Sequence, residues 1–324
     1  MTGMHRTGRK KVRIRKNRRD QSLHSPVVEV SGRRLELSNL QKIYFPEKGL
    51  SKGDLLKYYL DISPWLLPYL KNRPMVLKRF PDGIYGKTFY QKRCPEYAPK
   101  WLDTVVISGE EGAINYCLCS DVPSLLWMIN QGCIEIHALL SRVGALDTPD
   151  VLTLDLDPAE EVPFEQVLEV ASHVKDALDK FGLNGYPKTS GASGIHVYVP
   201  VQEHYSYAEI RTAAKLLAEM VCSVLPEHAT IERRVDMRGK KVYVDYLQNV
   251  KGKTLASVYS VRPYPDATVS APLKWEEIIK NQIFPRMFTV ESIFARLEEL
   301  GDLFIPVLED PQALEPVLGT ARRP

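Results

Sequence analysis

The sequence predicts a mixed α/β fold built from two interleaved α/β modules around a central cleft. Short runs rich in β-branched and aromatic residues alternate with longer stretches whose apolar residues recur at helical spacing. A chain of 324 residues can also bury a large core. Its hydrophobic and charged fractions, 44% and 26%, are typical of a soluble globular protein, and no apolar run approaches the roughly 20 residues that span a bilayer. We therefore expect no membrane segment.

The first half of the chain is predicted to consist mainly of short strands. Two strands and a turn precede a helix that begins after Ser51 and runs through Asp61, because Ser51 is a suitable N-cap and Asp54 lies in the first turn. Pro64 and Pro68 then bracket a further short helix. Strands are expected at 74–80, 87–93, 103–109, 113–120 and 134–142, and a helix at 124–133.

The second half is more regular. A strand at 151–156 leads to an amphipathic helix at 164–182, which Gly182 closes as a C-terminal cap. Further strands are expected at 186–191, 194–201 and 241–248, with a long helix at 206–225 and shorter helices from Leu273 onward. Strands that alternate with helices in this way favour an α/β architecture.

The positive charge of the chain is concentrated at its amino terminus. Residues 1–20 hold nine Lys or Arg and one acid, which leaves 34 bases against 39 acids in the rest of the chain. We expect residues 1–25 to form a basic, disordered arm suited to phosphate backbones, although a solubilising tail would have the same composition. The acidic body has to bind any nucleic acid through local patches.

The cysteine pattern argues against a disulfide framework and against a cysteine zinc site. The five cysteines are odd in number and none is spaced as CxxC. They are Cys94, Cys117, Cys119, Cys133 and Cys222. The pattern favours a reducing cytoplasm, and we expect Cys117 and Cys119 to be buried thiols of a strand.

The stretch VLTLDLDPAE places two aspartates one residue apart in an apolar strand. Asp155 and Asp157 point to the same face of that strand, where they repel each other. Mg²⁺ and Mn²⁺ prefer carboxylate oxygens, so a bound cation would offset the repulsion. As an isolated motif the pair is equally compatible with a salt-bridged strand edge.

The stretch KTSGASGIHVYVP predicts a turn that could hold an anion. Gly191 and Gly194 permit backbone conformations in which amide groups and the Ser190 hydroxyl converge on a phosphate. Ser193 lies within the turn, and His196 follows on the outgoing strand. We favour a phosphate cradle over an ordinary hairpin with a satisfied histidine.

A third acid, Asp245, lies in the middle of the strand VYVDYLQ. Gln248 follows it by three residues, Arg238 precedes it by seven, and Arg262 comes later. A carboxylate there needs a metal ion or an arginine, and an ion pair with Arg238 is the structural alternative. Together with the acid pair, Asp245 would complete a site for two cations about 4 Å apart, which suits in-line phosphoryl displacement.

In this order on strands, the three features resemble the archaeo-eukaryotic primase superfamily, and most closely the polymerase domain of bacterial DNA ligase D. The resemblance covers Leu37 to Ile305. The matching blocks are LSNLQKIYFPEKGLSKGDLLKYY, RPMVLKRFPDG, FYQKR, IEIHALLSR, LDLDP, TSGASGIH, VYVDYLQN and SVYSVR. The resemblance implies an archaeo-eukaryotic primase-like catalytic core over residues 26–310, followed by a C-terminal tail over residues 311–324.

The resemblance implies a nucleotidyl transferase. The expected enzyme is a template-dependent polymerase that prefers ribonucleotides and fills gaps or extends DNA ends in non-homologous end joining. Asp155, Asp157 and Asp245 would be catalytic and would bind two Mn²⁺ or Mg²⁺ ions, with Asp245 close to the primer 3′-hydroxyl. Eight residues would bind the nucleoside triphosphate: His137, Ser190, Gly191, Ser193, His196, Arg238, Gln248 and Arg262.

Three of the nucleotide-binding residues need further comment. His137 and Gln248 would lie near the sugar, where a contact to the 2′-hydroxyl favours ribonucleotides. A strand histidine bonded to backbone is the alternative for His137. Relatives often carry lysine in the turn at Ser193, so this chain lacks that charge beside the triphosphate.

The front half carries the residues that the resemblance assigns to DNA. Asn39, Lys42 and Lys52 match the family's pocket for a recessed 5′-phosphate, although without the resemblance both lysines would be ordinary surface residues. Phe89 and Tyr90 match aromatic residues at the DNA end, where a ring face accepts any base.

The resemblance also implies partners and a location. KRFPDG has the wrong spacing for a KxDG ligase motif, so sealing would need a separate protein or a separated domain. The resemblance, and no residue of this chain, implies a Ku-type partner and a bacterial cytoplasm beside the nucleoid. One alternative is a stand-alone primase. The other is a non-catalytic DNA-end binding module, but three carboxylates near DNA phosphates would be unfavourable in a protein that only binds DNA. A sugar transferase would leave Lys42, Lys52 and Arg262 unexplained.

Overall fold

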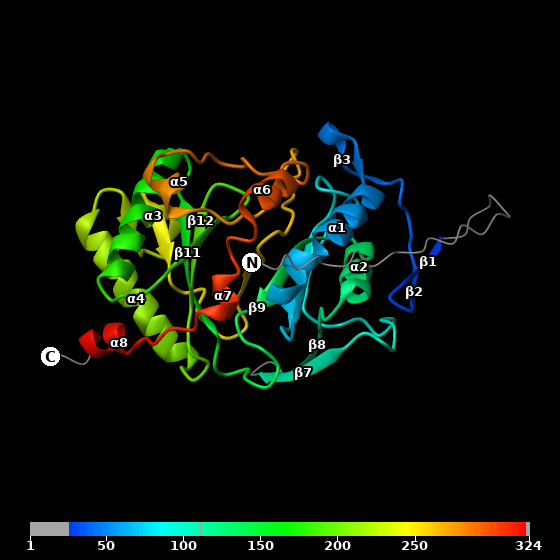
Figure 1. The fold of residues 1–324 in the computed structure, drawn as a ribbon, viewed down its shortest axis with the longest axis horizontal. Helices are drawn as coiled ribbons and strands as arrows, with labels where there is room; N and C mark the ends of the chain where they lie inside the picture. Colours follow the sequence, from blue (N-terminus) through cyan, green and yellow to red (C-terminus); the bar gives the residue numbers. More distant parts are fainter. Residues whose placement is uncertain (1–25, 110–111, 322–324) are drawn as a thin grey trace, which may run out of the picture.

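The computed structural model describes residues 26–109 and 112–321, and the arm expected at residues 1–25 lies outside them. Within the described residues, no helix is both long and apolar enough to span a membrane. The longer strands form two sheets, one with α3 and α4 beside it and the other with α1 and α2 (Figure 1).

The first sheet has five strands in the order β11-β12-β10-β14-β13, and only β13 and β14 run parallel. The strands are β10 (Val151–Pro158), β11 (Tyr186–Thr189), β12 (Ile195–Pro200), β13 (Ala229–Thr230) and β14 (Val242–Asp245). Helices α3 (Phe164–Asp179) and α4 (Tyr207–Val224) pack on this sheet. Leu154 and Leu156 of β10 are fully buried in the core. Alternation along the strand therefore turns its two aspartates to the opposite face.

The second sheet has four antiparallel strands in the order β15-β9-β5-β6. These are β5 (Met75–Arg79), β6 (Phe89–Gln91), β9 (Cys133–Leu139) and β15 (Thr254–Ala256). Helix α1 (Lys52–Leu70) packs on α2 (Val122–Asn130), and α2 packs on β9. The Tyr59 hydroxyl of α1 donates to the carbonyl of Ile134 on β9 at 2.6 Å, which fixes the helix to the sheet.

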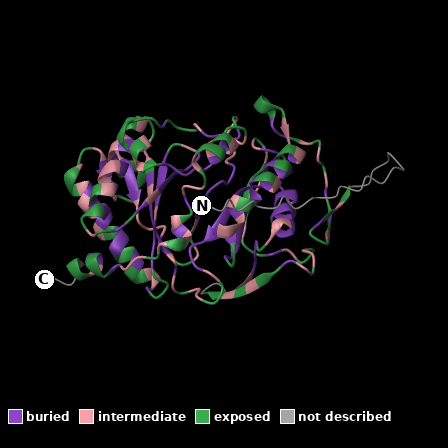
Figure 2. Cartoon of the chain, viewed as in Figure 1, coloured by how far each residue is buried: buried purple, intermediate pink, exposed green. Residues whose placement is uncertain are grey.

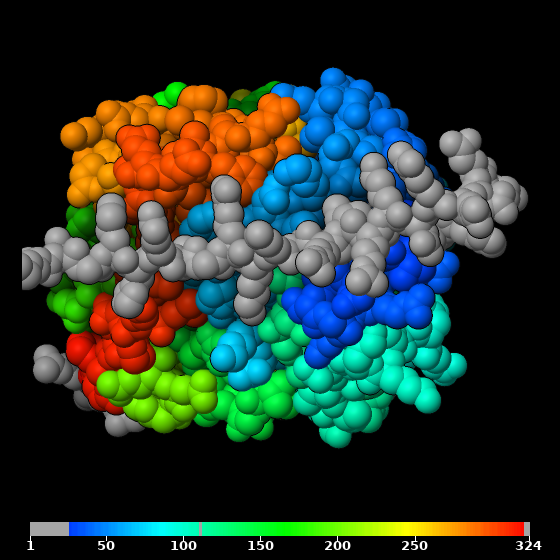
Figure 3. Space-filling model, turned by 45° about the vertical axis from the view of Figure 1, so that its right-hand side comes forward, coloured from blue at the N-terminus to red at the C-terminus, as the bar shows by residue number. Residues whose placement is uncertain are grey.

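The two modules are interleaved, as predicted. Strand β15 comes from the second half of the chain but pairs with β9 of the first half, with Ala256 opposite His137. Buried residues from both halves form one large core cluster (Figure 2). On the molecular surface, the orange and red C-terminal segments lie beside the blue N-terminal ones (Figure 3). The predicted mixed α/β architecture is therefore confirmed.

Smaller elements complete the described fold. They are the strands β1 (Val27–Val30), β2 (Arg33–Glu36), β3 (Ile43–Phe45), β4 (Leu50–Ser51), β7 (Thr104–Gly109) and β8 (Gly112–Cys117), and the helices α5 (Trp275–Ile279), α6 (Ile293–Leu300), α7 (Pro306–Glu309) and α8 (Glu315–Ala321). The strands form three hairpins, β1–β2, β3–β4 and β7–β8.

The helix boundary expected near Asp61 is wrong, because α1 continues to Leu70 through both prolines. Pro64 has no N–H to donate to the carbonyl of Leu60. The Ser63 hydroxyl donates to that carbonyl at 2.8 Å and replaces the missing bond. The start of the helix is as predicted, with Ser51 as its N-cap.

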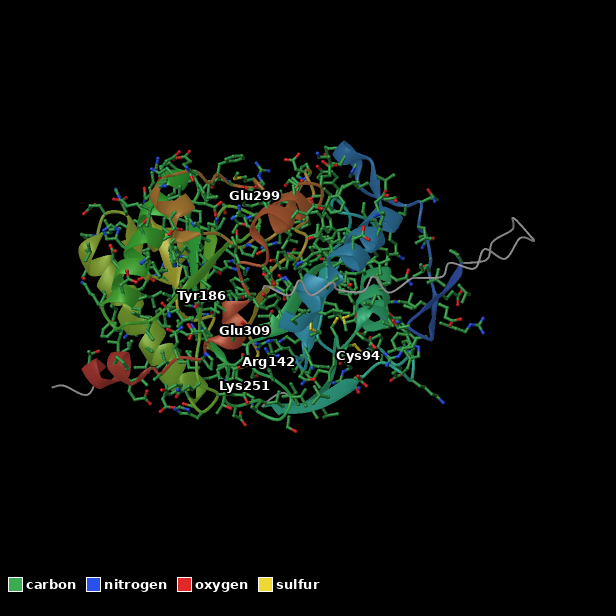
Figure 4. The ribbon with its side chains drawn as sticks, in the orientation of Figure 1. Cys94, Arg142, Tyr186, Lys251, Glu299 and Glu309 are labelled. Carbon is green, nitrogen blue, oxygen red and sulfur yellow. A yellow bond between two sulfur atoms is a disulfide. The ribbon has the colours of Figure 1, made fainter. Side chains whose placement is uncertain are left out.

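The expectation that Cys117 is a free thiol is also wrong. Cys117 at the end of β8 forms a disulfide with Cys94, which Figure 4 labels on the loop after β6. The Cys94 amide donates to the carbonyl of Asn115 at 2.7 Å and so holds this loop against β8. Spacing along the chain gives no sign of that tertiary contact. Cys119, the other predicted buried thiol, is buried and free, as is Cys133.

The segment expected to be a C-terminal tail packs on the domain as far as it is described. Leu314 and Val317 are fully buried, and the Leu314 amide donates to the Tyr205 hydroxyl at 2.8 Å. Helix α8 lies against α4.

Candidate active site

Four polar side chains lie in one row across the five-stranded sheet. Asp155 on β10 is in register with His196 on β12 and with Asp245 on β14, and His196 is in register with Lys188 on β11. Directly opposite residues project from the same face of a sheet. Asp157 lies two residues further along β10 and shares that face. The structure therefore brings the three predicted acids together.

The two aspartates of β10 repel each other at the edge of a buried region. Burial, together with the charges of Asp157 and Asp245, raises the pKa of Asp155 to about 7. Burial also raises the pKa of Asp157, Arg238 opposes that shift, and Asp245 adds to it. The Asp155 side chain is 17% exposed and the Asp157 side chain 57%. A cation at the exposed side would relieve the repulsion.

The Asp245 carboxylate accepts three hydrogen bonds from residues at or just after the end of β14. Its Oδ1 accepts from the Tyr243 hydroxyl at 3.1 Å and from the Leu247 amide at 2.8 Å, and its Oδ2 accepts from the Gln248 amide group at 2.9 Å. Gln248 therefore orients a predicted catalytic acid in this structure.

Arg238 pairs with Asp157, and the alternative of an ion pair with Asp245 is wrong. Its Nη1 lies 3.7 Å from Asp157 Oδ2, and its guanidinium stacks on the Tyr243 ring at 3.8 Å. Two further bonds run to the carbonyls of Glu232 and Arg233, both at 3.0 Å.

The oxygen ligands of the three acids are of the type that a divalent metal ion prefers. Mg²⁺ and Mn²⁺ prefer carboxylate oxygens, and three carboxylates share one sheet face here. In the part of the chain that the structure describes, no three His, Cys, Asp or Glu side chains are arranged so that they could hold a metal ion. The carboxylates of Asp155, Asp157 and Asp245 face His196, Arg238 and Gln248 instead. They would have to turn toward a common point to bind an ion.

The turn between β11 and β12 needs its two glycines for close packing. Gly191 has φ +73°, and a Cβ there would lie 2.7 Å from Cγ of Arg262. A Cβ on Gly194 would lie 2.3 Å from the carbonyl oxygen of Leu156 on β10. The turn is thereby pressed against the strand of the acid pair.

In this structure the amides of this turn bond a side chain of the turn itself, and the phosphate cradle stays a prediction. The amides of Ala192 and Gly194 donate to Ser190 Oγ at 3.1 and 3.0 Å, so the serine itself satisfies them. Ser193 is exposed in the turn. Arg262 reaches the turn from the other side, where its Nη1 donates to the Ser190 carbonyl at 2.5 Å.

Glu135 organises a second polar cluster, and the sequence reasoning missed it. It is fully buried on β9 and forms ion pairs with Lys78 of β5 and with Arg262, whose Nε lies 2.8 Å from Oε2. Burial alone would raise the pKa of Glu135, but the bond from His137 and the charges of Arg262 and Lys78 lower it to about 2. The available signal was Glu135 itself, a carboxylate in the apolar strand CIEIHAL.

The hydrogen bonding of His137 leaves one ring nitrogen unused. Burial lowers the pKa of His137, so its ring is neutral and has one donor and one acceptor nitrogen. Nε2 lies 3.3 Å from the ionised Glu135 carboxylate and therefore carries the proton. Nδ1 is the acceptor, and it is buried with no hydrogen-bond partner among the described residues. The alternative of a histidine bonded to backbone therefore does not hold for Nδ1.

The three residues predicted to bind a 5′-phosphate are neighbours at the start of α1. Backbone bonds join Lys52 to Lys42 at 2.8 Å and Lys42 to Asn39 at 3.0 Å. The Lys42 ammonium pairs with Asp82. Lys52 is only 3% exposed, and its ammonium donates to the Ser38 carbonyl at 2.7 Å. Burial and then the positive charge of Lys42 lower the pKa of Lys52 to about 8.

The predicted DNA-end aromatics lie on the edge strand β6 and face solvent. Phe89 is 38% and Tyr90 58% exposed. The Arg79 guanidinium lies 5.3 Å from the Phe89 ring and also bonds Tyr97, which is exposed and was not predicted. The Tyr90 ring meets the His137 ring edge-on at 5.8 Å. The aromatic edge and the unpaired histidine nitrogen are therefore adjacent.

Comparison with known proteins identifies the family of this chain. The family model for the LigD primase-polymerase domain matches residues 51–304. The chain is 35% identical over 280 residues to the bifunctional non-homologous end joining protein LigD of Bacillus subtilis. The aligned region covers 86% of this chain and 45% of that protein. It is 32% identical over 279 residues to the multifunctional non-homologous end joining protein LigD of Mycolicibacterium smegmatis, and the aligned region covers 86% of this chain and 36% of that protein. The chain therefore spans less than half the length of these two relatives.

A solved structure extends the comparison to three dimensions. The polymerase domain from Mycobacterium tuberculosis Ligase D, solved in complex with DNA, matches with a TM-score of 0.80 at 29% identity. The match covers 86% of this chain and 99% of that one, and it confirms the archaeo-eukaryotic primase-like fold. The matches to the family model and to these relatives show that the chain belongs to the LigD primase-polymerase domain family, a family of nucleotidyltransferases.

Proposed function

We propose that this chain is a template-dependent polymerase that fills gaps or extends DNA ends during non-homologous end joining. The observation that carries the proposal is the register of Asp155 with Asp245, beside Asp157, which gathers three acids on one sheet face. When bound there, two Mn²⁺ or Mg²⁺ ions would lower the pKa of the primer 3′-hydroxyl and neutralise the leaving pyrophosphate.

The chain's own residues would orient the two substrates. Asp245, held by the Leu247 amide and Gln248, would lie closest to the primer 3′-hydroxyl. Arg262 is fixed between Glu135 and the Ser190 carbonyl. Its guanidinium, with the nearby Ser190 hydroxyl, would bind the triphosphate through charge-assisted bonds.

The unused nitrogen of His137 supports a preference for ribonucleotides. A buried acceptor without a partner gains a hydrogen bond when a sugar hydroxyl reaches it. A ribose 2′-hydroxyl can donate to Nδ1, whereas a deoxyribose leaves that nitrogen unsatisfied. Because Nδ1 is buried in the structure, the residues around it would have to move to admit the sugar.

Replacing His137 by phenylalanine is expected to lower the preference for ribonucleotides over deoxyribonucleotides about tenfold or more, because only the ribonucleotide loses a bond. The measurement is kcat/KM for both nucleotides on the same template. His204→Phe, a substitution on the exposed surface far along the chain, is the control and should leave the ratio unchanged. An unchanged ratio in His137→Phe would contradict this role.

Lys52 would recognise the 5′-phosphate of a gapped or resected end together with Lys42 and Asn39. The Lys52 ammonium is charged below a pKa of about 8 and neutral above it. The preference for a 5′-phosphate over a 5′-hydroxyl is therefore expected to be full near neutral pH and to fall as the pH rises through 8. Dissociation constants for the two ends between pH 7 and pH 9.5 give the test, with pH values chosen around that pKa.

The ratio of the two dissociation constants is expected to fall by about tenfold or more. That factor corresponds to the free energy of one hydrogen bond to a charged group. Lys52→Met should lack the preference at every pH. A preference that stays constant across the range in the wild type would contradict the assignment of Lys52.

Extension of a gapped template tests the proposed function as a whole. The protein should add ribonucleotides to a primer opposite a template, with Mn²⁺ or Mg²⁺, and should do so best when the gap carries a 5′-phosphate. Robust synthesis without a primer, indifferent to that phosphate, would favour a stand-alone primase. DNA-end binding without any incorporation would favour the binding module.

Such a polymerase would work with a Ku-type end-binding protein and with a ligase, which could be a separate protein or a separate domain. These partners are implied by the resemblance to LigD, whose members compared above are end-joining proteins. The proposed location is a bacterial cytoplasm, at the nucleoid where broken ends occur.

A further inference from the structure

Glu135 on β9 is a fully buried carboxylate that three side chains share. Strand pairing places Lys78 of β5 directly opposite Glu135, and the Lys78 ammonium pairs with its Oε1. Arg262, which follows β15, forms an ion pair with Oε2 through its Nε at 2.8 Å. Nε2 of His137, two residues further along β9, lies 3.3 Å from the same oxygen. One carboxylate therefore joins two strands of the four-stranded sheet to a segment from the second half of the chain.

The surroundings of Glu135 fix the direction of its bond to His137. Two cations within ion-pair distance keep the carboxylate ionised despite its burial. An ionised carboxylate can only accept hydrogen bonds, so the imidazole has to donate to it through Nε2. The ring is thereby oriented with Nδ1, its second nitrogen, available to another partner. Among the described residues, that nitrogen has none.

Arg262 extends the arrangement to the turn between β11 and β12. Its Nη1 donates to the Ser190 carbonyl at 2.5 Å, while its Nε remains beside Glu135. A guanidinium is planar and rigid, so these two contacts fix the position of its charge. Glu135 therefore sets both the orientation of the imidazole and the position of the cation, which the proposed function assigns to the sugar and to the triphosphate.

We propose that Glu135 is a positioning residue for sugar selection, because it holds the His137 ring so that Nδ1 meets the 2′-hydroxyl of a nucleotide whose triphosphate Arg262 binds. The inference rests on the proposed function for the identity of that ligand. Glu135 itself has no exposed surface with which to touch the nucleotide. It acts through its two partners, which it keeps at a fixed separation.

A purely structural carboxylate predicts a different result. Removing a buried acceptor beside two cations would lower stability, and the activity toward every nucleotide would then fall with the amount of folded protein. The ratio of kcat/KM for a ribonucleotide to that for the matching deoxyribonucleotide does not depend on that amount. It changes only when the sugar site itself changes.

The test measures that ratio on one gapped, primed template for Glu135→Asp and Glu135→Gln. Aspartate keeps the charge beside Lys78 and Arg262 but is one methylene shorter, so it draws the carboxylate away from the His137 ring. Glutamine keeps the size, but its amide has only one acceptor oxygen in place of two. In both variants the ratio should fall about tenfold, which corresponds to the loss of one hydrogen bond. The KM for the ribonucleotide should rise by a similar factor.

Two controls isolate the path through His137. Glu277→Gln removes a carboxylate on α5 that pairs with Arg296 at 2.8 Å and is only 17% exposed. It should lower stability and leave the ratio unchanged. In His137→Phe, adding Glu135→Asp should lower the ratio no further, because the imidazole through which Glu135 acts is missing.

The outcomes separate this inference from the proposed function. An unchanged ratio in a folded Glu135→Asp or Glu135→Gln overturns the inference while the wild type still extends primers. An undiminished effect of Glu135→Asp in His137→Phe overturns it as well. If neither single variant folds, Glu135→Gln combined with Lys78→Met keeps the net charge of the cluster and gives the same readout. If the wild type adds no nucleotide, the proposed function is wrong, and dissociation constants for the two nucleotides then give the ratio that tests Glu135.

Discussion

Replacing Asp155 or Asp157 by asparagine is expected to reduce nucleotide incorporation by about a thousandfold or more. Each substitution removes a negative oxygen that the proposed metal ions would need, and metal ions contribute several kcal/mol to transfer reactions of this kind. The measurement is single-turnover extension of a gapped, primed template at saturating Mn²⁺ and nucleotide. DNA binding should change little, because these acids are not part of the proposed 5′-phosphate pocket.

The matched control is Asp179→Asn. Asp179 is an exposed acid on α3 that pairs with Lys175 four residues earlier, so the same chemical change occurs far from the acid row. It should leave the extension rate unchanged. Normal incorporation by Asp155→Asn and Asp157→Asn would show that the row does not bind catalytic metal, and the polymerase proposal would lose its main support.

The same Asp155→Asn substitution is expected to stabilise the metal-free protein. Folding raises the pKa of Asp155 from 3.8 to about 7, so the folded state binds a proton more tightly than the unfolded state does. Below pH 4 the carboxyl is protonated in the folded and the unfolded state, so it does not affect the free energy of unfolding. Its ionisation lowers that free energy increasingly between pH 4 and 7 and by a constant amount above pH 7. At pH 8 the substitution should raise the free energy of unfolding by up to about 4 kcal/mol, at about 1.4 kcal/mol per unit of pKa.

Chemical denaturation in the presence of a chelator at pH 4 and pH 8 gives the measurement. The difference between variant and wild type should be large at pH 8 and near zero at pH 4. Titration with Mn²⁺ should then raise the melting temperature of the wild type more than that of the variant, since ligands stabilise the state that binds them. Clear destabilisation by Asp155→Asn without metal would instead mean that the carboxylate is a structural partner of His196.

The local part of this site could be predicted from the sequence. Alternation in an apolar strand was enough to place Asp155 and Asp157 on one face, and the glycines of KTSGASG were enough to predict a turn. The strand register was not available from the sequence. Only the paired strands show that Asp245 and His196 lie directly opposite Asp155, because that pairing depends on tertiary packing.

The partners of buried polar residues were harder to predict from the sequence. Glu135 and Lys188 look like isolated charges in apolar strands, and their partners come from other strands and from loops distant in the chain. The Cys94–Cys117 disulfide was missed for the same reason. Pro64 was misread because proline usually breaks a helix, whereas here the Ser63 hydroxyl supplies the bond that proline cannot.

The contact between Tyr90 and His137 has a thermodynamic consequence. If a DNA end stacks on Tyr90, as the proposed function has it, the surroundings of His137 would change, because the two rings are in contact. Lys78 strengthens this connection, because its ammonium pairs with Glu135 and lies 5.5 Å from the Tyr90 ring. Linkage is reciprocal: if binding of the end alters the affinity for the nucleotide, the nucleotide must alter the affinity for the end by the same factor. Under the proposed function, end recognition and sugar selection would then be one cooperative equilibrium.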